Sequence, residues 1–119
     1  MSIVSSLVVA LVALLHLYFL YLEMFLWNKP YGIRTFDLTP EFADESKSLA
    51  ANQGLYNGFL AAGLLWGLFS ADGFEFKVFF LACVVVAGLY GGLTTNRKIL
   101  WIQALPGVIA LALVVVAGR

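Results

Sequence analysis

The sequence contains few charged residues. Of its 119 residues, 12% are charged and 62% are hydrophobic, and the formal net charge is zero. Soluble domains carry about 25% charged residues, so this composition excludes an ordinary soluble domain. The lysines and arginines form no basic tract, and we therefore expect no nucleic-acid partner.

Cysteine and histidine are scarce as well. Cys83 is the single cysteine and His16 the single histidine, so no intrachain disulfide can form. One histidine and one cysteine in opposite halves of the bundle do not make a metal-ligand set. The sequence also lacks a phosphate loop, a nucleophile elbow and a redox pair. We expect neither a metal nor a cofactor.

The N-terminal segment lacks the features of a secretory signal peptide. Residues 2–6 contain no positive charge, and no small-residue cleavage site follows the first apolar run. Long apolar stretches, in contrast, are abundant, and a membrane-spanning helix needs roughly 20 mainly apolar residues. They lie at about residues 3–26, 49–69, 76–93 and 99–117.

This pattern predicts an all-α fold, an integral membrane four-helix bundle that forms a single four-span domain over residues 1–119. One longer loop, at residues 28–47, separates the first two helices, and tight turns at 70–73 and 95–98 separate the others. Pro106-Gly107 should kink the last helix or free a carbonyl. The predicted helices are about 3–26, 40–69, 74–94 and 99–117.

The start of the second helix has a distinct signature. Thr39 is a capping residue, Pro40 suits the first helical position, and Glu41 complements the helix dipole. The helix therefore begins near Pro40 and runs on to the membrane stretch. The alternative is a short interfacial helix at about 40–47 that is followed by a bend.

Positive charges predict the orientation. With four spans, the loops after the first and third helices share one side of the membrane. They carry most of the lysines and arginines, which places them in the cytoplasm and both termini outside. These loop residues are Lys29, Arg34, Lys47, Arg97 and Lys98, against Lys77 and Arg119 on the other side.

Small residues four apart predict the helix contacts, because they let helix backbones approach closely. Such pairs occur on the second helix and on the third. They indicate packing within the monomer, with a homodimer seam as the alternative. The pairs are Gly54/Gly58, Gly58/Ala62, Gly63/Gly67, Ala87/Gly91 and Gly88/Gly92.

The polar side chains at membrane depth all fall in the half of the bundle next to the loops after the first and third helices. They predict one cavity that opens to one side. His16 and Glu23 share a helix face about 10 Å apart, so a ligand, water or the amides of the second helix would have to bridge them. The predicted ligand-binding residues are His16, Glu23, Asn52, Gln53, Tyr56, Asn57, Asn96 and Gln103.

The amides alone are compatible with structural hydrogen bonds between helices. Gln103 could also satisfy a carbonyl that Pro106 frees. His16 and Glu23 instead favour a function, since ionisable residues inside a membrane are rare and usually mark a site or path. They are the candidate catalytic residues.

Residues 16–27 (HLYFLYLEMFLW) and 49–64 (LAANQGLYNGFLAAGL) resemble the domain of unknown function 1304 family of small bacterial membrane proteins. The resemblance covers essentially the whole chain and implies a four-span protein of the bacterial inner membrane, without an assigned activity. In the family pattern an acidic residue precedes the histidine, where this chain has Leu15.

These observations favour a protein that binds a small lipophilic or amphipathic molecule in the one-sided cavity, with membrane lipids as neighbours. Two other functions remain as alternatives. One is a proton-coupled exporter that acts as a dimer through Glu23, and the other is a membrane enzyme for a lipid-like substrate, with His16 and Glu23 as acid and base. A structural or accessory subunit is the simplest explanation.

Overall fold

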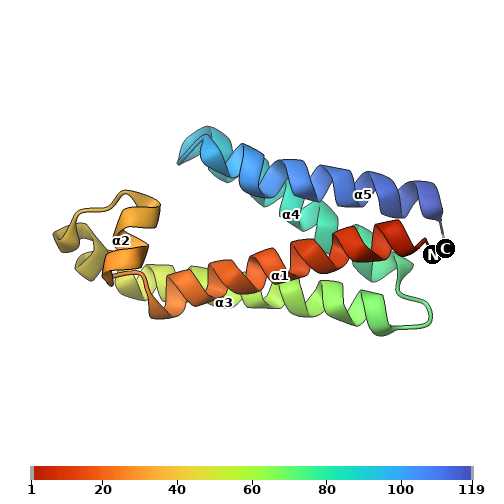
Figure 1. Ribbon diagram of the computed structural model, residues 1–119, viewed down its shortest axis with the longest axis horizontal. Helices are drawn as coiled ribbons and strands as arrows, with labels where there is room; N and C mark the ends of the chain where they lie inside the picture. The colour runs from red at the N-terminus through yellow and green to blue at the C-terminus, as the bar shows by residue number, and fades with distance from the viewer. Residues whose placement is uncertain (1, 119) are drawn as a thin grey trace. The chain divides into compact units, whose positions relative to one another are not determined.

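The computed structural model describes residues 2–118, and over these residues the chain is helical and contains no β-strand. The predicted all-α fold is confirmed, but the number of helices is not: five α-helices and one π-helical segment replace the four predicted helices (Figure 1). They are α1 (Ile3–Phe25), α2 (Pro30–Phe36), α3 (Pro40–Phe69), α4 (Phe74–Thr94), η1 (Leu100–Ala104) and α5 (Leu105–Ala117).

Three helical stretches are long and apolar enough to cross a membrane. They are α1, α4 and the combined η1–α5 stretch, Leu100–Ala117. α3 is the longest helix, with 30 residues, but it is not among these stretches. Its first half carries charges, and the amides of Asn52, Gln53 and Asn57 lower the hydropathy of its second half.

The predicted long loop is wrong for residues 30–36, which form α2. Pro30 occupies the start of α2, where its fixed φ suits a helix and its missing N–H is no loss. α2 ends at Asp37, whose N–H donates to the carbonyls of Ile33 and Arg34. The left-handed conformation of Asp37 (φ 59°) then lets the N–H of Leu38 reach the Ile33 carbonyl at 3.0 Å. The predicted loop at residues 28–47 missed that Pro30 begins a helix.

The predicted start of α3 is confirmed. The hydroxyl of Thr39 accepts a hydrogen bond of 3.1 Å from the N–H of Phe42, which satisfies one of the free donors of the first turn. α3 then continues without interruption from Pro40 to Phe69, so the alternative of a bend near residue 48 is wrong.

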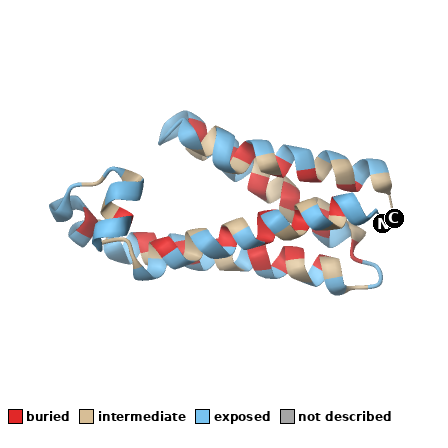
Figure 2. Ribbon diagram, in the orientation of Figure 1, coloured by how far each residue is buried: buried red, intermediate tan, exposed pale blue. Residues whose placement is uncertain are grey.

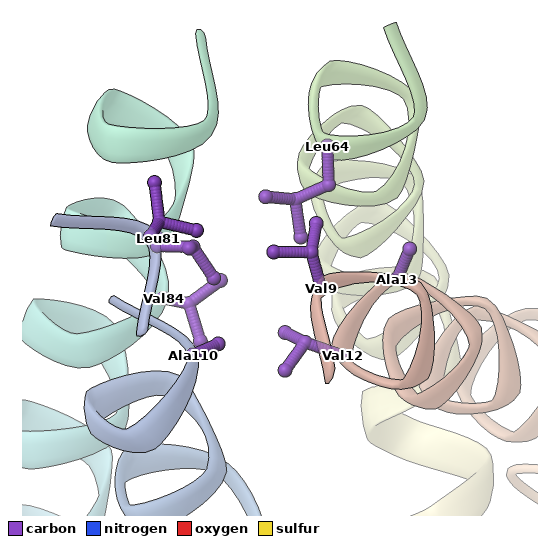
Figure 3. Close-up of a cluster of buried hydrophobic side chains, with 8 residues drawn as sticks. Val9, Val12, Ala13, Leu64, Leu81, Val84 and Ala110 are labelled. Atoms are coloured by element: carbon purple, nitrogen blue, oxygen red, sulfur yellow. The ribbon is translucent and has the colours of Figure 1, made fainter. Parts of the chain in front are cut away.

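The chain forms two compact units, and the first combines the beginning of α1 with the residues from Leu60 onwards. Its core consists of valine, leucine and alanine side chains that are at most 1% exposed. Figure 3 shows side chains of α1 and α3 facing those of α4 and α5. These small, branched side chains let four helices pack closely. The core residues are Val9, Val12, Ala13, Leu64, Leu81, Val84, Ala110 and Val114.

The η1 segment marks the position where Pro106 affects the last span. The expected irregularity takes the form of a π-helical stretch that ends just before Leu105 and Pro106. η1 lies against α4 at a glycine, since a Cβ atom on Gly88 would come within 2.8 Å of the Ala104 nitrogen.

The second unit spans Leu15–Phe59 and contains the end of α1, α2 and the beginning of α3. Burial recurs along these helices at helical spacing (Figure 2). α3 runs antiparallel to α1, because Gly54 lies against Met24 whereas Gly58 lies against Leu20. The predicted close approach at Gly54 and Gly58 is therefore made within the chain.

Candidate functional site

The second unit brings together two of the predicted site residues, Glu23 and Asn57. The side-chain amide of Asn57 donates a hydrogen bond of 2.5 Å to Oε1 of Glu23. Asn57 is 7% exposed, whereas Glu23 is partly exposed. A buried amide and a carboxylate at membrane depth each need a partner, and here they satisfy one another.

Gly54 explains how α3 comes close enough to form this hydrogen bond. A Cβ atom at Gly54 would lie 2.7 Å from Cγ of Met24 and 3.1 Å from Cβ of Glu23, so only glycine leaves room for α1 at this level. Asn57 follows Gly54 by three residues and therefore points to a neighbouring part of the same helix surface. The glycine and the amide thus act together to define the site.

A hollow of about 210 Å³ adjoins Glu23 on the side of the α1–α2 connection. Its wall contains a carboxylate, an ammonium group, an amide, a hydroxyl and an indole together with two apolar side chains. None of the other predicted ligand-binding residues lines it. The lining residues are Glu23, Met24, Trp27, Asn28, Lys47, Ser48 and Ala51.

Two hydrogen bonds hold the connection after α1 against the beginning of α3. The indole N–H of Trp27 donates to the hydroxyl of Ser46 at 2.9 Å. The side-chain amide of Asn28 donates to a carboxylate oxygen of Asp44 at 3.1 Å. Trp27 and Asn28 are therefore positioned by α3, and the wall that they form is pre-organised.

α2 supports the same wall from outside. The ring of Phe36 lies 4.8 Å from the ring of Trp27, centroid to centroid. The hydroxyl groups of Tyr18 in α1 and Tyr31 in α2 share a hydrogen bond. These contacts attach α2 to the end of α1 and keep the indole of Trp27 in place.

His16 does not line the hollow. It is fully buried on α1 and contacts the ring of Phe19 edge-on, with 5.2 Å between ring centroids. Its Nε2 atom is buried and makes no hydrogen bond within residues 2–118, although other interactions hold the side chain. The role assigned to His16 stays a prediction.

Asn52, Gln53 and Tyr56 lie on the exposed surface of α3. Because α3 is antiparallel to α1, Asn52 and Gln53 lie about one helical turn beyond Asn57 towards the end of α1. The ring of Tyr56 contacts the ring of Phe59 edge-on, with 5.8 Å between ring centroids.

The last two predicted residues belong to the first unit and have local partners there. The carboxamide oxygen of Asn96 accepts a hydrogen bond of 2.9 Å from the backbone N–H of Lys98, which stabilises the turn after α4. The side-chain amide of Gln103 donates to the Val84 carbonyl at 3.0 Å and links η1 to α4. A carbonyl freed by Pro106 was the alternative partner for Gln103, but the Val84 carbonyl that Gln103 contacts lies on α4.

Residues 2–118 contain no group of three or more histidine, cysteine, aspartate or glutamate side chains that could hold a metal ion. A second hollow, of about 90 Å³, lies at the α3–α4 turn and is bordered by Lys77, which is only 3% exposed. Gly67 makes room for this lysine, since a Cβ atom there would lie 2.7 Å from its Cγ atom.

Sequence reasoning missed most of the wall around Glu23. It used Trp27 only as part of the segment at residues 16–27 that resembles the family, and Lys47 only as a charge that sets orientation. The available signal was the position of Trp27-Asn28 directly after one apolar helix and of Lys47-Ser48 directly before the next apolar stretch. Segments that border the same loop meet when their helices are antiparallel.

The comparisons with known proteins agree on a family. The family described as protein of unknown function (DUF1304) matches residues 10–115 of this chain. A relative from Lactococcus lactis subsp. lactis (strain IL1403), described as uncharacterized protein YpaA, is 35% identical over 114 residues, which are 93% of this chain and 96% of the relative. No solved structure matches the chain. Neither description names an activity.

Proposed function

We propose a function from the site alone for this chain, which belongs to the family described as protein of unknown function (DUF1304). The chain is a membrane protein that binds a small amphipathic molecule in the hollow beside Glu23. One observation carries the proposal. A carboxylate oriented by a buried amide opens onto a pre-organised hollow with both polar and apolar walls.

The size of the hollow indicates how much of a ligand it holds. Sites for drug-sized molecules measure about 300–1,000 Å³, whereas this hollow measures about 210 Å³. It therefore suits the polar end of an amphipathic molecule, and the apolar remainder stays in the membrane. Met24 and Ala51 supply the apolar part of the wall.

We propose that the chain crosses the membrane four times. α3 accompanies α1 in both units, through Gly54 and Gly58 in one and through Leu64 in the core of the other. If α1 crosses the membrane, α3 then crosses beside it in the opposite direction. We propose the bacterial inner membrane as the location of the chain, with the loops after the first and third crossings in the cytoplasm and both termini outside.

The test fills the hollow without changing its charge. Ala51→Trp places an indole within the wall, while Ala62→Trp places one at an exposed position of the same helix and serves as the control. Wild type and both variants are purified, and their co-purifying small molecules are compared by native mass spectrometry. We expect a bound amphipathic molecule in wild type and Ala62→Trp that is lost in Ala51→Trp. Identical molecules in all three proteins would refute the proposal.

A further inference from the structure

We propose that the polar end of the ligand is zwitterionic, with a cationic amine that binds Glu23 and an anionic group that binds Lys47. This inference rests on the proposed binding function and specifies the ligand. It follows from the two opposite charges that border one small hollow, one from α1 and one from α3.

Glu23 is suited to a cation. Its partner Asn57 is a neutral amide, which orients one carboxylate oxygen at 2.5 Å but adds no positive charge. Asn57 is buried and does not line the hollow, whereas Glu23 does. An ammonium group in the hollow would add a charge-assisted hydrogen bond, which is stronger than a neutral one.

The neighbours of Glu23 suit an amine on a carbon chain. Trp27 borders the hollow, and an indole attracts cations through its ring better than other aromatic side chains do. Its ring is held by Ser46 and by Phe36, so it does not have to be ordered when a ligand binds. Met24 offers an adaptable apolar contact to the methylene groups.

Lys47 provides the complementary charge. It lies on α3 with Ser48 beside it, and both border the hollow. A lysine ammonium and a serine hydroxyl together donate hydrogen bonds to a phosphate or carboxylate. An uncharged ligand would use neither charge, and a purely cationic ligand would meet the like charge of Lys47.

The position of the hollow narrows the chemistry to groups found at a membrane surface. Glu23 lies in the last turn of α1, which ends at Phe25, and α1 is long and apolar enough to span a membrane. The hollow thus opens where headgroups reside. A phosphoethanolamine group has an amine two carbons from a phosphate and carries both required charges. Its source is either a phospholipid or a free molecule.

The experiment measures dissociation constants for full-length protein in an uncharged detergent. The probes are dihexanoyl phosphatidylethanolamine, dihexanoyl phosphatidylglycerol and free phosphoethanolamine. The two lipids share chains and phosphate but differ in the amine. Glu23→Gln and Lys47→Gln are compared with Glu45→Gln and Lys98→Gln, which remove the same charges at exposed positions outside the hollow. Glutamine at position 23 can still accept the hydrogen bond of Asn57, so the variant should fold.

We expect wild type to bind the ethanolamine lipid at least tenfold more tightly than the glycerol lipid. Glu23→Gln should weaken binding of the ethanolamine lipid roughly 10- to 100-fold and abolish the preference for it over the glycerol lipid. Lys47→Gln should weaken the binding of both lipids by similar factors. The two control variants should bind both lipids with the dissociation constants of wild type. Tight binding of free phosphoethanolamine identifies a soluble source, and binding of the lipid alone identifies a membrane source; both support the zwitterionic ligand.

Equal binding of both lipids by wild type would overturn the proposal of a zwitterionic ligand. An unchanged preference of Glu23→Gln for the ethanolamine lipid would overturn it as well. The proposed binding function would survive that result if Ala51→Trp still lost its co-purifying molecule. Failure of both lipids to bind, together with identical co-purifying molecules in Ala51→Trp and wild type, would remove the binding function as well.

Discussion

Asn57 and Glu23 place two strongly polar groups at the contact between α3 and α1. The amide is buried and the carboxylate partly so, and the hydrogen bond between them satisfies both. Interhelical hydrogen bonds between side chains in membranes average about 0.6 kcal/mol. Here the acceptor is a carboxylate, and a charged group that loses its buried partner loses more than a neutral one.

Asn57→Ala should therefore lower the free energy of unfolding by about 1–3 kcal/mol. The double variant Glu23→Ala/Asn57→Ala should lose less than the sum of the two single variants, because each substitution removes the same hydrogen bond. The measurement is reversible unfolding of the purified protein in detergent. Asn52→Ala, at an exposed position of the same helix, is the control and should stay within about 0.5 kcal/mol of wild type. Strict additivity of the two single variants would show that the hydrogen bond contributes nothing to stability.

Glycines in the helices have different consequences according to what lies opposite them. A Cβ atom at Gly54 would meet Met24 at 2.7 Å, whereas one at Gly91 of α4 would meet Ile99 at 3.5 Å, an ordinary contact distance. Glycine is otherwise less favourable than alanine in a helix, by roughly 0.5–1 kcal/mol. The two positions should thus respond to the same substitution with opposite signs.

Gly54→Ala should destabilise the protein by about 1–3 kcal/mol, because α1 and α3 must move apart to admit the methyl group. Gly91→Ala should leave stability unchanged or raise it by up to roughly 1 kcal/mol. Thermal unfolding in detergent, followed by circular dichroism at 222 nm, compares the two. A destabilisation of equal size in both variants would contradict the close approach of α1 and α3 at Gly54.

At the scale of the whole molecule, the main question is how often the chain crosses the membrane. Three helical stretches qualify by length and hydropathy. α3 does not, but its 30 residues extend about 45 Å, against roughly 30 Å for the apolar core of a bilayer. Its antiparallel contacts with α1 favour the proposed fourth crossing, in which the Asn57–Glu23 hydrogen bond would lower the cost of placing polar residues in the membrane.

Single cysteines should reveal this crossing. In a Cys83→Ser background, Arg34→Cys and Arg97→Cys should react with a membrane-impermeant maleimide only from the cytoplasmic side, as the positive charges indicate. Ala71→Cys, in the turn between α3 and α4, should react only from the outside. Intact spheroplasts and inverted vesicles provide the two sides. Labelling of positions 34 and 71 from the same side would show that α3 does not cross.

The sequence by itself determined the family, the all-α fold, the helix start at Thr39-Pro40 and the turns after α3 and α4. These features depend on local chemistry: apolar length, capping groups and breakers act within a few residues of each other. The same reasoning failed for α2, because Pro30 is a signal both for the end of one helix and for the start of the next. It also overestimated the hydropathy of α3.

Only the tertiary structure decided which polar residues meet. Eight residues shared one half of the predicted bundle, yet Asn57 pairs with Glu23, Gln103 with the Val84 carbonyl and Asn96 with its own turn. Depth along a helix follows from counting residues, but the direction a side chain faces depends on how the helices rotate against each other. That rotation is set by packing at contacts such as Gly54 on Met24. It places Trp27 and Lys47, rather than His16, around the hollow beside Glu23.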